Sequence, residues 1–350
     1  MSIESTYWEA SNRARKLIRE NIVIDALMAA AWPISWSEAE QFHPYFDRAV
    51  ETGITAIGFT TAYSYMKQTG LLQETLRTVK KIKERPDRYI IVRTVKDIKD
   101  AQTNGKLAIY FISQSCEPLD NDPDNIALYR EMGFGYMLLA YNERTRIGDG
   151  CYTPENAGLT LYGKQVIDAM NRYGMPVDLS HVGERTSLDA SDYSSQPVIY
   201  SHSNPNAVCP CNRNISDEQI KTCAATGGVV NTAWAGWIIS PDFPNQVTPA
   251  HCVNAIDYIV QLVGIDHVGF GSDDAFITEP YVEFAKSVPE AYDDGGYTLE
   301  SALKGAFCAG EPAKLLPAVV DGLIEKGYTD ADIQKVIGGN MLRVLGQVWK

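Results

Sequence analysis

The sequence predicts an α/β protein, and within that class a (β/α)8 TIM-type barrel formed by one domain of residues 1–350. Eight short apolar runs alternate with amphipathic helical stretches along the chain. The runs are almost continuously apolar, which is typical of parallel strands covered on both faces. No repeat, low-complexity tract or linker marks a domain boundary. A doubly wound open sheet is the alternative, because a sequence does not show closure.

The expected elements follow one another in a regular order. Charged and apolar residues alternate in the first 21 residues, which predicts an amphipathic helix. Eight strands are then expected at 21–27, 53–62, 106–115, 136–142, 175–181, 197–203, 227–234 and 267–274.

The helices between these strands have recognisable ends. Residues 161–174 and 216–228 show helical spacing of apolar residues, and each segment ends in glycine. We expect Ser216 to cap the first turn of its helix and Glu218 to neutralise the exposed amides there. Residues 329–350 are predicted to form a final helical segment.

Composition and charge exclude several classes of protein. With 45% hydrophobic and 21% charged residues, the chain has ordinary globular composition. Its net charge of −13 repels a phosphate backbone, so nucleic acid is not expected as a partner. The first 21 residues contain no uninterrupted apolar core, so they predict neither a signal peptide nor a membrane span.

Seven cysteines, an odd number, are scattered without the spacing of a disulfide framework, which favours a cytoplasmic location. Cys209 and Cys211 form a Cys-x-Cys pair, but a second cysteine pair for a zinc site is missing. We therefore interpret these two as reduced thiols in a loop.

Two of the five histidines follow expected strands that end in the same way. "VDLSH" and "VIYSH" place His181 and His202 directly after Ser at neighbouring strand ends. Strand C-termini meet at one mouth of such a barrel. Two imidazoles there can bind one divalent ion, with zinc–nitrogen distances of about 2.0–2.1 Å. A single histidine would be interpreted as a buried, hydrogen-bonded imidazole, but the repetition favours a shared site. The polar and aromatic residues expected at the mouth are Gln114, Tyr141, Asp178, His181, His202, Trp234, Trp237, Asp273 and Asp274.

The other three histidines are assigned to structural roles. His43 precedes Pro44 in what is expected to be a polar loop, and His251 has no place at a strand end. His267 opens a strand, which puts it at the opposite rim of the barrel.

A succession of segments resembles one known family. "GKQVIDAMNRYGMPVDLSHVGERTSLDA", "PVIYSHSNPNAV", "NRNISDEQI", "ATGGVV", "DHVGFGSDD" and "VIGGNMLRVL" occur in the order and spacing of the membrane (renal) dipeptidase family of zinc peptidases, within the amidohydrolase superfamily. The resemblance extends from about residue 20 to the end. It implies an amidohydrolase-like (β/α)8 barrel, metal-assisted hydrolysis of a short amide, and a homodimer.

The resemblance also implies roles for individual residues. His181 and His202 match the two histidines that bind the second metal of the family. Arg213 matches the arginine that holds the substrate carboxylate, and Asp273 matches the acid near the scissile bond.

Other positions depart from the family pattern. Leu27 and Ala29 stand where the family has the His-x-Asp that binds its first metal. Gln114 replaces the bridging glutamate, and Tyr141 replaces the histidine after the fourth strand. An amide brings no negative charge to a metal site. We therefore expect at most one zinc ion, on His181, His202 and Gln114, or none. The aspartates that could supply a missing carboxylate are Asp25, Asp178, Asp273 and Asp274.

Two hypotheses from different classes follow. The first is a dipeptidase-like hydrolase of a small amide or peptide that bears a carboxylate. In it Asp273 is the general base or acid, Tyr141 polarises the carbonyl, and Arg213 pairs bidentately with the carboxylate. Trp234 and Trp237 would line an apolar pocket with "LMAAAWP", although tryptophans also pack in cores. The second is a metal-free lyase or isomerase, or a small-molecule-binding protein, on the same barrel.

Overall fold

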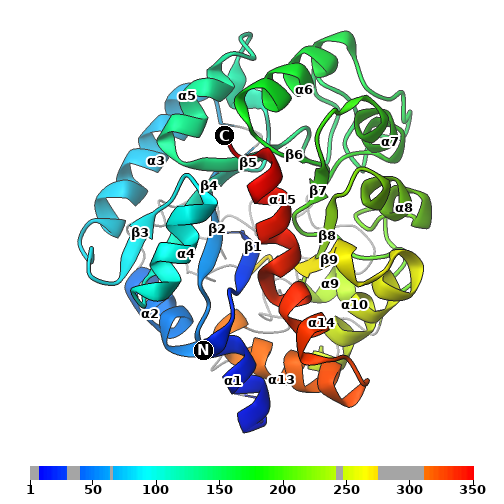
Figure 1. Ribbon diagram of the computed structural model, residues 1–350. Helices are drawn as coiled ribbons and strands as arrows, with labels where there is room; N and C mark the ends of the chain where they lie inside the picture. The colour runs from blue at the N-terminus through cyan, green and yellow to red at the C-terminus, as the bar shows by residue number, and fades with distance from the viewer. Residues whose placement is uncertain (1–7, 30–39, 64–65, 242–246, 275–310) are drawn as a thin grey trace.

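At the centre of the computed structural model, which describes residues 8–29, 40–63, 66–241, 247–274 and 311–350, lies a parallel sheet rolled into a barrel (Figure 1). Each strand of the barrel pairs in parallel with the next along the chain. The eight strands are β1 (Ile24–Met28), β2 (Ala56–Ala62), β4 (Leu107–Ser113), β5 (Phe134–Leu138), β6 (Val177–Asp178), β7 (Val198–Tyr200), β8 (Val229–Thr232) and β9 (Val268–Phe270).

Backbone hydrogen bonds after β9 close the barrel onto β1. The Asp273 amide donates to the Leu27 carbonyl at 2.9 Å, and the Ala29 amide donates to the Asp274 carbonyl at 2.9 Å. Met28 and Asp274 also form a parallel bridge. The sheet therefore has the predicted (β/α)8 closure, and the open-sheet alternative is wrong.

The strands differ from the expected ones in number and length. A ninth strand, β3 (Tyr89–Ile91), pairs with Leu107–Ile109 at the start of β4, outside the ring of eight. It was not predicted, because it is three residues long and its Ile90 is 39% exposed. Several expected strands were also too long. β6 ends at Asp178, before the expected end at His181, and Asp178 Oδ1 accepts the Ser180 amide that follows.

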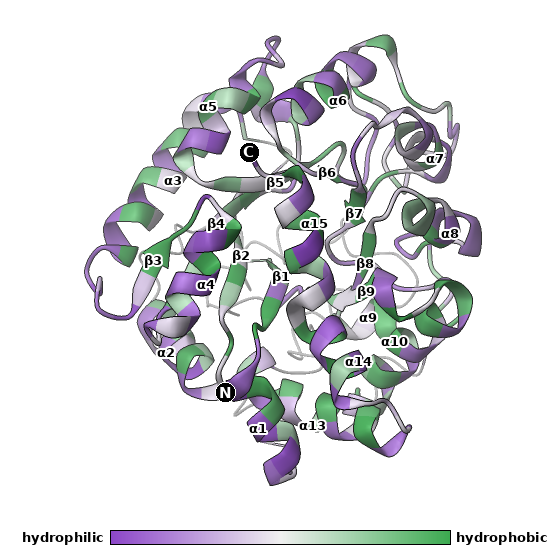
Figure 2. Ribbon diagram, viewed as in Figure 1, coloured by the Kyte–Doolittle hydropathy of each residue, from purple (hydrophilic) through white to green (hydrophobic). Residues whose placement is uncertain are grey.

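Helices surround the barrel, and their hydrophobic residues lie mainly on the inner side (Figure 2). The helices predicted at 161–174 and 216–228 are confirmed as α6 and α8. Gly174 ends α6 with φ 75°, and the Ser216 side chain accepts the Gln219 amide at the start of α8. Among the described residues, the helices before β9 are α1 (Asn12–Glu20), α2 (Phe42–Thr52), α3 (Gln68–Ile82), α4 (Val95–Thr103), α5 (Asn125–Met132), α6 (Leu161–Tyr173), α7 (Glu184–Tyr193), α8 (Asp217–Ala225), α9 (Gly236–Ile239) and α10 (Pro249–Val263), with single 3-10 turns at Glu117–Leu119 and Ile265–His267.

The last part of the chain packs against the outer helices and the N-terminal ends of the strands. It consists of α13 (Pro312–Glu325), α14 (Asp330–Gln334), a π-helical turn (Lys335–Gly339) and α15 (Asn340–Val348). In Figure 1, α15 crosses in front of the strands. The Asn340 side chain donates to the Val268 carbonyl at 2.8 Å, and the Trp349 indole donates to the Gly135 carbonyl at 3.0 Å. Because these carbonyls lie at strand starts, the site must lie at the other end.

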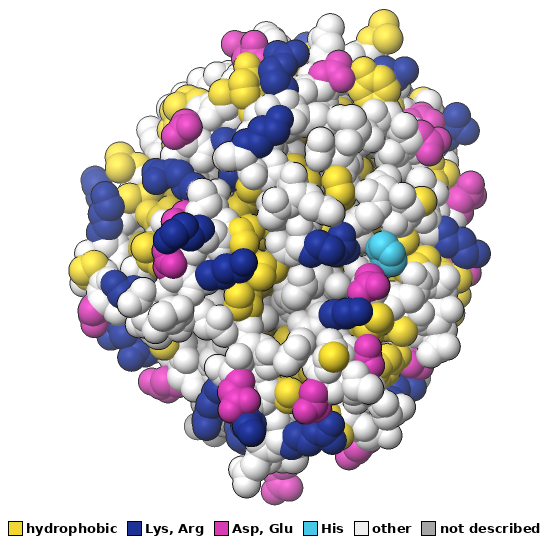
Figure 3. Space-filling view, viewed as in Figure 1, with side chains coloured by type: hydrophobic (Ala, Val, Ile, Leu, Met, Phe, Trp, Pro, Cys, Tyr) yellow, Lys and Arg dark blue, Asp and Glu magenta, His cyan; other side chains and the backbone are white. Residues whose placement is uncertain are grey.

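Charges of both signs are interspersed on the face drawn in Figure 3. The six cysteines within the described ranges are free thiols, as expected for Cys209 and Cys211, and Cys308 lies outside those ranges. Within the same ranges, the structure contains no helix with both the length and the apolar character needed to span a membrane.

Candidate functional site

The ends of β6 and β7 bring two imidazoles into direct contact. His181 and His202 are both buried, and their Nε2 atoms lie 2.9 Å apart. His181 has φ 65°, in the left-handed region that few residues other than glycine adopt. This conformation turns the chain sharply after β6 and directs the His181 ring toward the next strand end.

The residues after β5 hold His181 from two sides. The Asn142 Oδ1 atom lies 2.6 Å from His181 Nδ1, and the Tyr141 ring stacks on the imidazole with ring centroids 4.0 Å apart. The Cys151 amide donates to the His181 carbonyl at 2.8 Å. Asn142, which carried no recognisable sequence pattern, is therefore a site residue that the sequence analysis missed.

A group of polar side chains holds His202. The Ser201 Oγ atom lies 2.7 Å from His202 Nδ1 and 3.3 Å from Ser180 Oγ. The His202 amide donates to Ser180 Oγ at 3.0 Å. Each serine of the repeated Ser-His pair therefore contacts the second histidine, which explains why the two strands end alike.

The Asp178 carboxylate ties these two strand ends together. Its Oδ1 atom accepts the Ser180 amide at 3.1 Å and the Ser201 amide at 3.0 Å. Burial raises the pKa of Asp178 to about 6, and hydrogen bonds from Ser201 and Ser180 oppose this effect. Asp178 Oδ1 thus fixes the backbone just before each histidine, while no described group hydrogen-bonds the buried Oδ2 atom.

Asp25 performs the same structural role where the barrel closes. Its Oδ1 atom accepts the Leu27 amide at 3.2 Å and the Ser272 amide at 2.8 Å, while Oδ2 accepts the Ser272 hydroxyl at 2.6 Å. Burial raises its pKa to about 7. Ser272 directly precedes Asp273, so this carboxylate also fixes the backbone before a site residue.

Asp273 and Arg213 carry the charges of the site. Burial raises the pKa of Asp273 to about 7, while the Arg213 charge lowers it and the Asp274 charge raises it. Arg213 is 2% exposed, and it donates from Nη2 to the His202 carbonyl at 2.6 Å and from Nη1 to Ser203 Oγ at 3.0 Å. Burial, followed by the Arg213 charge, holds the pKa of both imidazoles well below its usual range, so both are neutral at pH 7.

Gln114, Trp234 and Trp237 remain of the predicted site residues. The Gln114 amide nitrogen donates to Thr60 Oγ1 at 3.2 Å, so this end of the side chain is bound to β2. Trp234 is fully buried and stacks on Phe270 with ring centroids 4.7 Å apart. That position matches core packing. Trp237 lies in α9 and is 9% exposed, and the part of "LMAAAWP" after Ala29 lies outside the described residues.

The donor set fits one metal ion better than two. Leu27 and Ala29 have no ligating atoms in their side chains, and nowhere in the described ranges do three or more His, Cys, Asp or Glu side chains form a group that could hold an ion. His181 and His202 nevertheless present two ring nitrogens at one point. Their other ring nitrogens contact Asn142 and Ser201, as is usual for metal-binding histidines. A single ion with these two ligands is compatible with the residues present.

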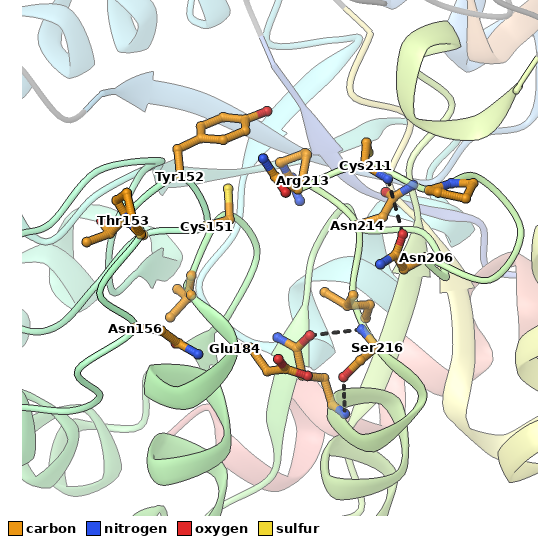
Figure 4. Close-up of a pocket in the computed structure, with 18 residues that line it drawn as sticks. Cys151, Tyr152, Thr153, Asn156, Glu184, Asn206, Cys211, Arg213, Asn214 and Ser216 are labelled. Carbon is orange, nitrogen blue, oxygen red and sulfur yellow. Dashed lines mark hydrogen bonds between the residues drawn. The ribbon is translucent and has the colours of Figure 1, made fainter. Parts of the chain in front are cut away.

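A pocket of about 700 Å³ lies between the loops that follow β5, β6 and β7, and its lining includes Arg213 and Val182, the residue after His181. Figure 4 shows Arg213 among its lining residues, with Cys151 and Tyr152 from one loop and Cys211 and Asn214 from another. The lining is largely polar. Arg213 therefore contacts both the backbone of His202 and a pocket large enough for a small molecule.

The three other histidines each contact a polar group away from the His181–His202 pair. His43 Nε2 contacts Glu84 at 2.9 Å, His251 Nδ1 contacts the Thr248 amide at 3.1 Å, and His267 Nδ1 contacts the Gly228 carbonyl at 2.9 Å. The expected loop around His43 was wrong, since this residue lies in the first turn of α2. Pro44 is tolerated there because the first helical amides need no partner within the helix.

The sequence of this chain resembles those of known dipeptidases. Residues 11–285 match the membrane dipeptidase family (peptidase family M19). The dipeptidase tcpJ of Claviceps purpurea is 28% identical over 264 residues, which are 75% of this chain and 56% of that protein. The chain thus spans little more than half of that relative.

Solved structures extend the likeness to the fold. The crystal structure of an amidohydrolase from Pseudomonas aeruginosa is 27% identical, with a TM-score of 0.83 over 96% of this chain and 99% of that one. A metallo peptidase from Rhodobacter sphaeroides, liganded with a phosphinate mimic of L-Ala-D-Ala, shares the fold at 18% identity, with a TM-score of 0.74 over 94% of this chain and 100% of that one.

Proposed function

The chain belongs to the membrane dipeptidase family, and from that premise we propose that it hydrolyses an amide or peptide bond in a small substrate that carries a carboxylate. One observation carries this proposal. Arg213, a buried cation that lines an open pocket, donates to the backbone carbonyl of His202, whose neutral imidazole contacts that of His181. A carboxylate bound by Arg213 would place the adjoining amide bond next to the two imidazoles.

The residues of the chain divide the work as follows. Arg213 recognises the carboxylate through N–H groups that its two internal hydrogen bonds leave available, since a guanidinium has five donors. Asp273, with its pKa near 7, takes and returns a proton at neutral pH. Tyr141 polarises the carbonyl of the substrate, while its ring keeps His181 in place. Trp237, and Trp234 if its packing opens, add apolar contacts.

His181 and His202, with Gln114 as a third donor, would hold at most one zinc ion. When bound, such an ion supplies a water of lowered pKa and polarises the amide. The protein is expected to work as a homodimer, on small molecules.

A metal-free lyase, isomerase or binding protein is the alternative. Two observations favour it: the direct contact between His181 and His202, and a raised pKa at Asp273 that suits proton transfer without a metal.

Metal analysis combined with activity separates these functions. The protein, purified without chelators, would be assayed for zinc content and for hydrolysis of dipeptides and N-acyl amino acids, before and after metal removal. We expect up to one zinc per chain and hydrolysis that is lost with the metal and restored by adding it. Hydrolysis that survives complete metal removal would contradict the metal-dependent proposal, and the absence of any hydrolysis would favour the alternative.

A further inference from the structure

We propose that Asn142 and Ser201 are positioning residues that set the tautomers of His181 and His202 in two different ways. Asn142 fixes His181 in one tautomer, whereas Ser201 allows His202 to change from one tautomer to the other. The tautomers follow from contacts alone. Only the part of the proposal that concerns a metal ion rests on the proposed function.

The oxygen atom that contacts His181 Nδ1 can only accept a hydrogen bond. Asn142 Oδ1 lies 2.6 Å from His181 Nδ1, and a carboxamide oxygen has no hydrogen to donate. Nδ1 must therefore carry the proton of the neutral ring. The Nε2 atom of His181 is left with a lone pair, directed at His202.

The partner of His202 can both donate and accept. Ser201 Oγ lies 2.7 Å from His202 Nδ1, and a hydroxyl rotates to either role. Since His181 Nε2 has a lone pair, the 2.9 Å contact requires His202 to carry its proton on Nε2. The Ser201 hydroxyl then donates to His202 Nδ1. In this state the hydrogen bonds form one chain, from Ser201 through both histidines to Asn142.

The same contacts permit the opposite state of His202. If a cation or another electron-pair acceptor enters between the rings, one proton leaves Nε2 and one is taken up at Nδ1, so the ring stays neutral. Nδ1 then donates to Ser201 Oγ, and the Ser201 hydroxyl turns to donate to Ser180 Oγ, 3.3 Å away. Both imidazoles would then present a lone pair to the site.

The surrounding backbone keeps both positioning side chains in place. Asp178 Oδ1 accepts the Ser201 amide, and the Tyr152 amide donates to the Asn142 carbonyl at 2.8 Å. A side chain at Gly150 would put its Cβ 2.2 Å from the Asn142 carbonyl carbon, so only glycine permits this close approach. The side chains of Asn142 and Ser201 are therefore held by separate parts of the barrel mouth.

Nitrogen NMR of protein with ¹⁵N-labelled histidine tests the proposal directly, because the chain has only five histidines. Long-range ¹H–¹⁵N spectra of the metal-free protein at pH 7.5 should show His181 protonated at Nδ1 and His202 at Nε2. The signals of the two imidazoles are assigned from the spectra of His181→Gln and His202→Gln, each of which lacks one set of signals. His181 protonated at Nε2 in the unmodified protein would overturn the proposal without any further variant.

Variants test each positioning residue. Asn142→Leu should release His181 from its single tautomer, and Asn142→Asp, which keeps an acceptor, should restore it. If the proposed ion binds, Ser201→Ala should weaken zinc affinity by roughly 10–100-fold, and Ser201→Thr should restore it. Ser191→Ala is the matched control, because its buried hydroxyl donates to the Ser187 carbonyl within α7 at 2.8 Å.

The outcomes separate this inference from the proposed function. Tautomers as expected, together with no zinc binding, would support the role of Asn142 and contradict both the metal-dependent hydrolase and the change of the His202 tautomer by a zinc ion. An Asn142→Leu spectrum identical to that of the unmodified protein would overturn the role of Asn142. Equal zinc affinity for Ser201→Ala and Ser191→Ala would overturn the role of Ser201.

Discussion

The Nε2 atoms of His181 and His202 lie 2.9 Å apart because a single carboxylate oxygen, on Asp178, binds the backbone just before each of them. The pair is therefore built into the ends of two neighbouring strands. Whatever the site binds must approach these two ring nitrogens, and its charge must suit the nearby Arg213.

The number of metal ions is the first testable consequence. We expect at most one zinc per chain in the unmodified protein, because Leu27 and Ala29 cannot anchor a second ion. We expect none in His202→Ala, because this variant lacks one of the two histidine ligands. Elemental analysis measures this number. His267→Ala is the control, since that imidazole contacts the Gly228 carbonyl outside the site. Two ions per chain in the unmodified protein would contradict this prediction.

Replacing Arg213 with lysine tests recognition of the carboxylate. Lysine keeps the charge but loses the planar fork, and the hydrogen bonds to the His202 carbonyl and Ser203 would be weakened too. We expect kcat/KM for a carboxylate-bearing substrate to fall roughly 10–100-fold, as hydrogen bonds to charged groups contribute about 1.5–3 kcal/mol. Arg185→Lys is the matched control, because this arginine is exposed and pairs with Asp189. Equal turnover by both variants would show that Arg213 binds no carboxylate.

The buried carboxyl group of Asp25 should make stability depend on pH. Its pKa rises from 3.8 to about 7 on folding, so the folded protein binds this proton more tightly. The stabilisation is complete below about pH 4 and is lost as the pH rises through 7. In the unmodified protein, the free energy of unfolding should decrease between pH 5 and pH 8, and roughly 3 kcal/mol of this decrease comes from Asp25. Asp25→Asn lacks this titrating group, so its decrease should be smaller by that amount. Urea titrations at both pH values measure the difference, and parallel curves for the two proteins would contradict it.

The sequence predicted the barrel well, because its apolar runs report burial directly. All eight strands lie within or beside the expected ranges, although β5 begins at Phe134 and ends at Leu138 instead of covering 136–142. Strand ends were less predictable, since they depend on side chains such as Asp178 that bind the backbone. An apolar run could not indicate β3, because this short strand is partly exposed and pairs only with the first residues of β4.

The site was predictable only where its pattern repeats. Two Ser-His pairs after neighbouring strands were enough to expect His181 next to His202. Nothing in the sequence indicated Asn142, because its role depends on a loop that brings Cys151 against His181. The same holds for Asp25 and Asp178. As isolated carboxylates they looked like possible metal ligands, and only the structure shows that backbone amides bind them.

Asp178 finally provides a test of whether backbone hydrogen bonds hold the histidine pair in place. Asp178→Ala would leave the Ser180 and Ser201 amides buried without their acceptor, at about 1–3 kcal/mol for each. We therefore expect the free energy of unfolding to fall by roughly 2–6 kcal/mol. Asp178→Asn keeps an oxygen acceptor in the same place, so it should retain most of this stability and the affinity of the histidine pair for zinc. Urea unfolding at pH 7 measures the first effect and calorimetric zinc titration the second. If Asp178→Asn lost as much stability as Asp178→Ala, the negative charge of Asp178, instead of its two hydrogen bonds, would be what stabilises the site.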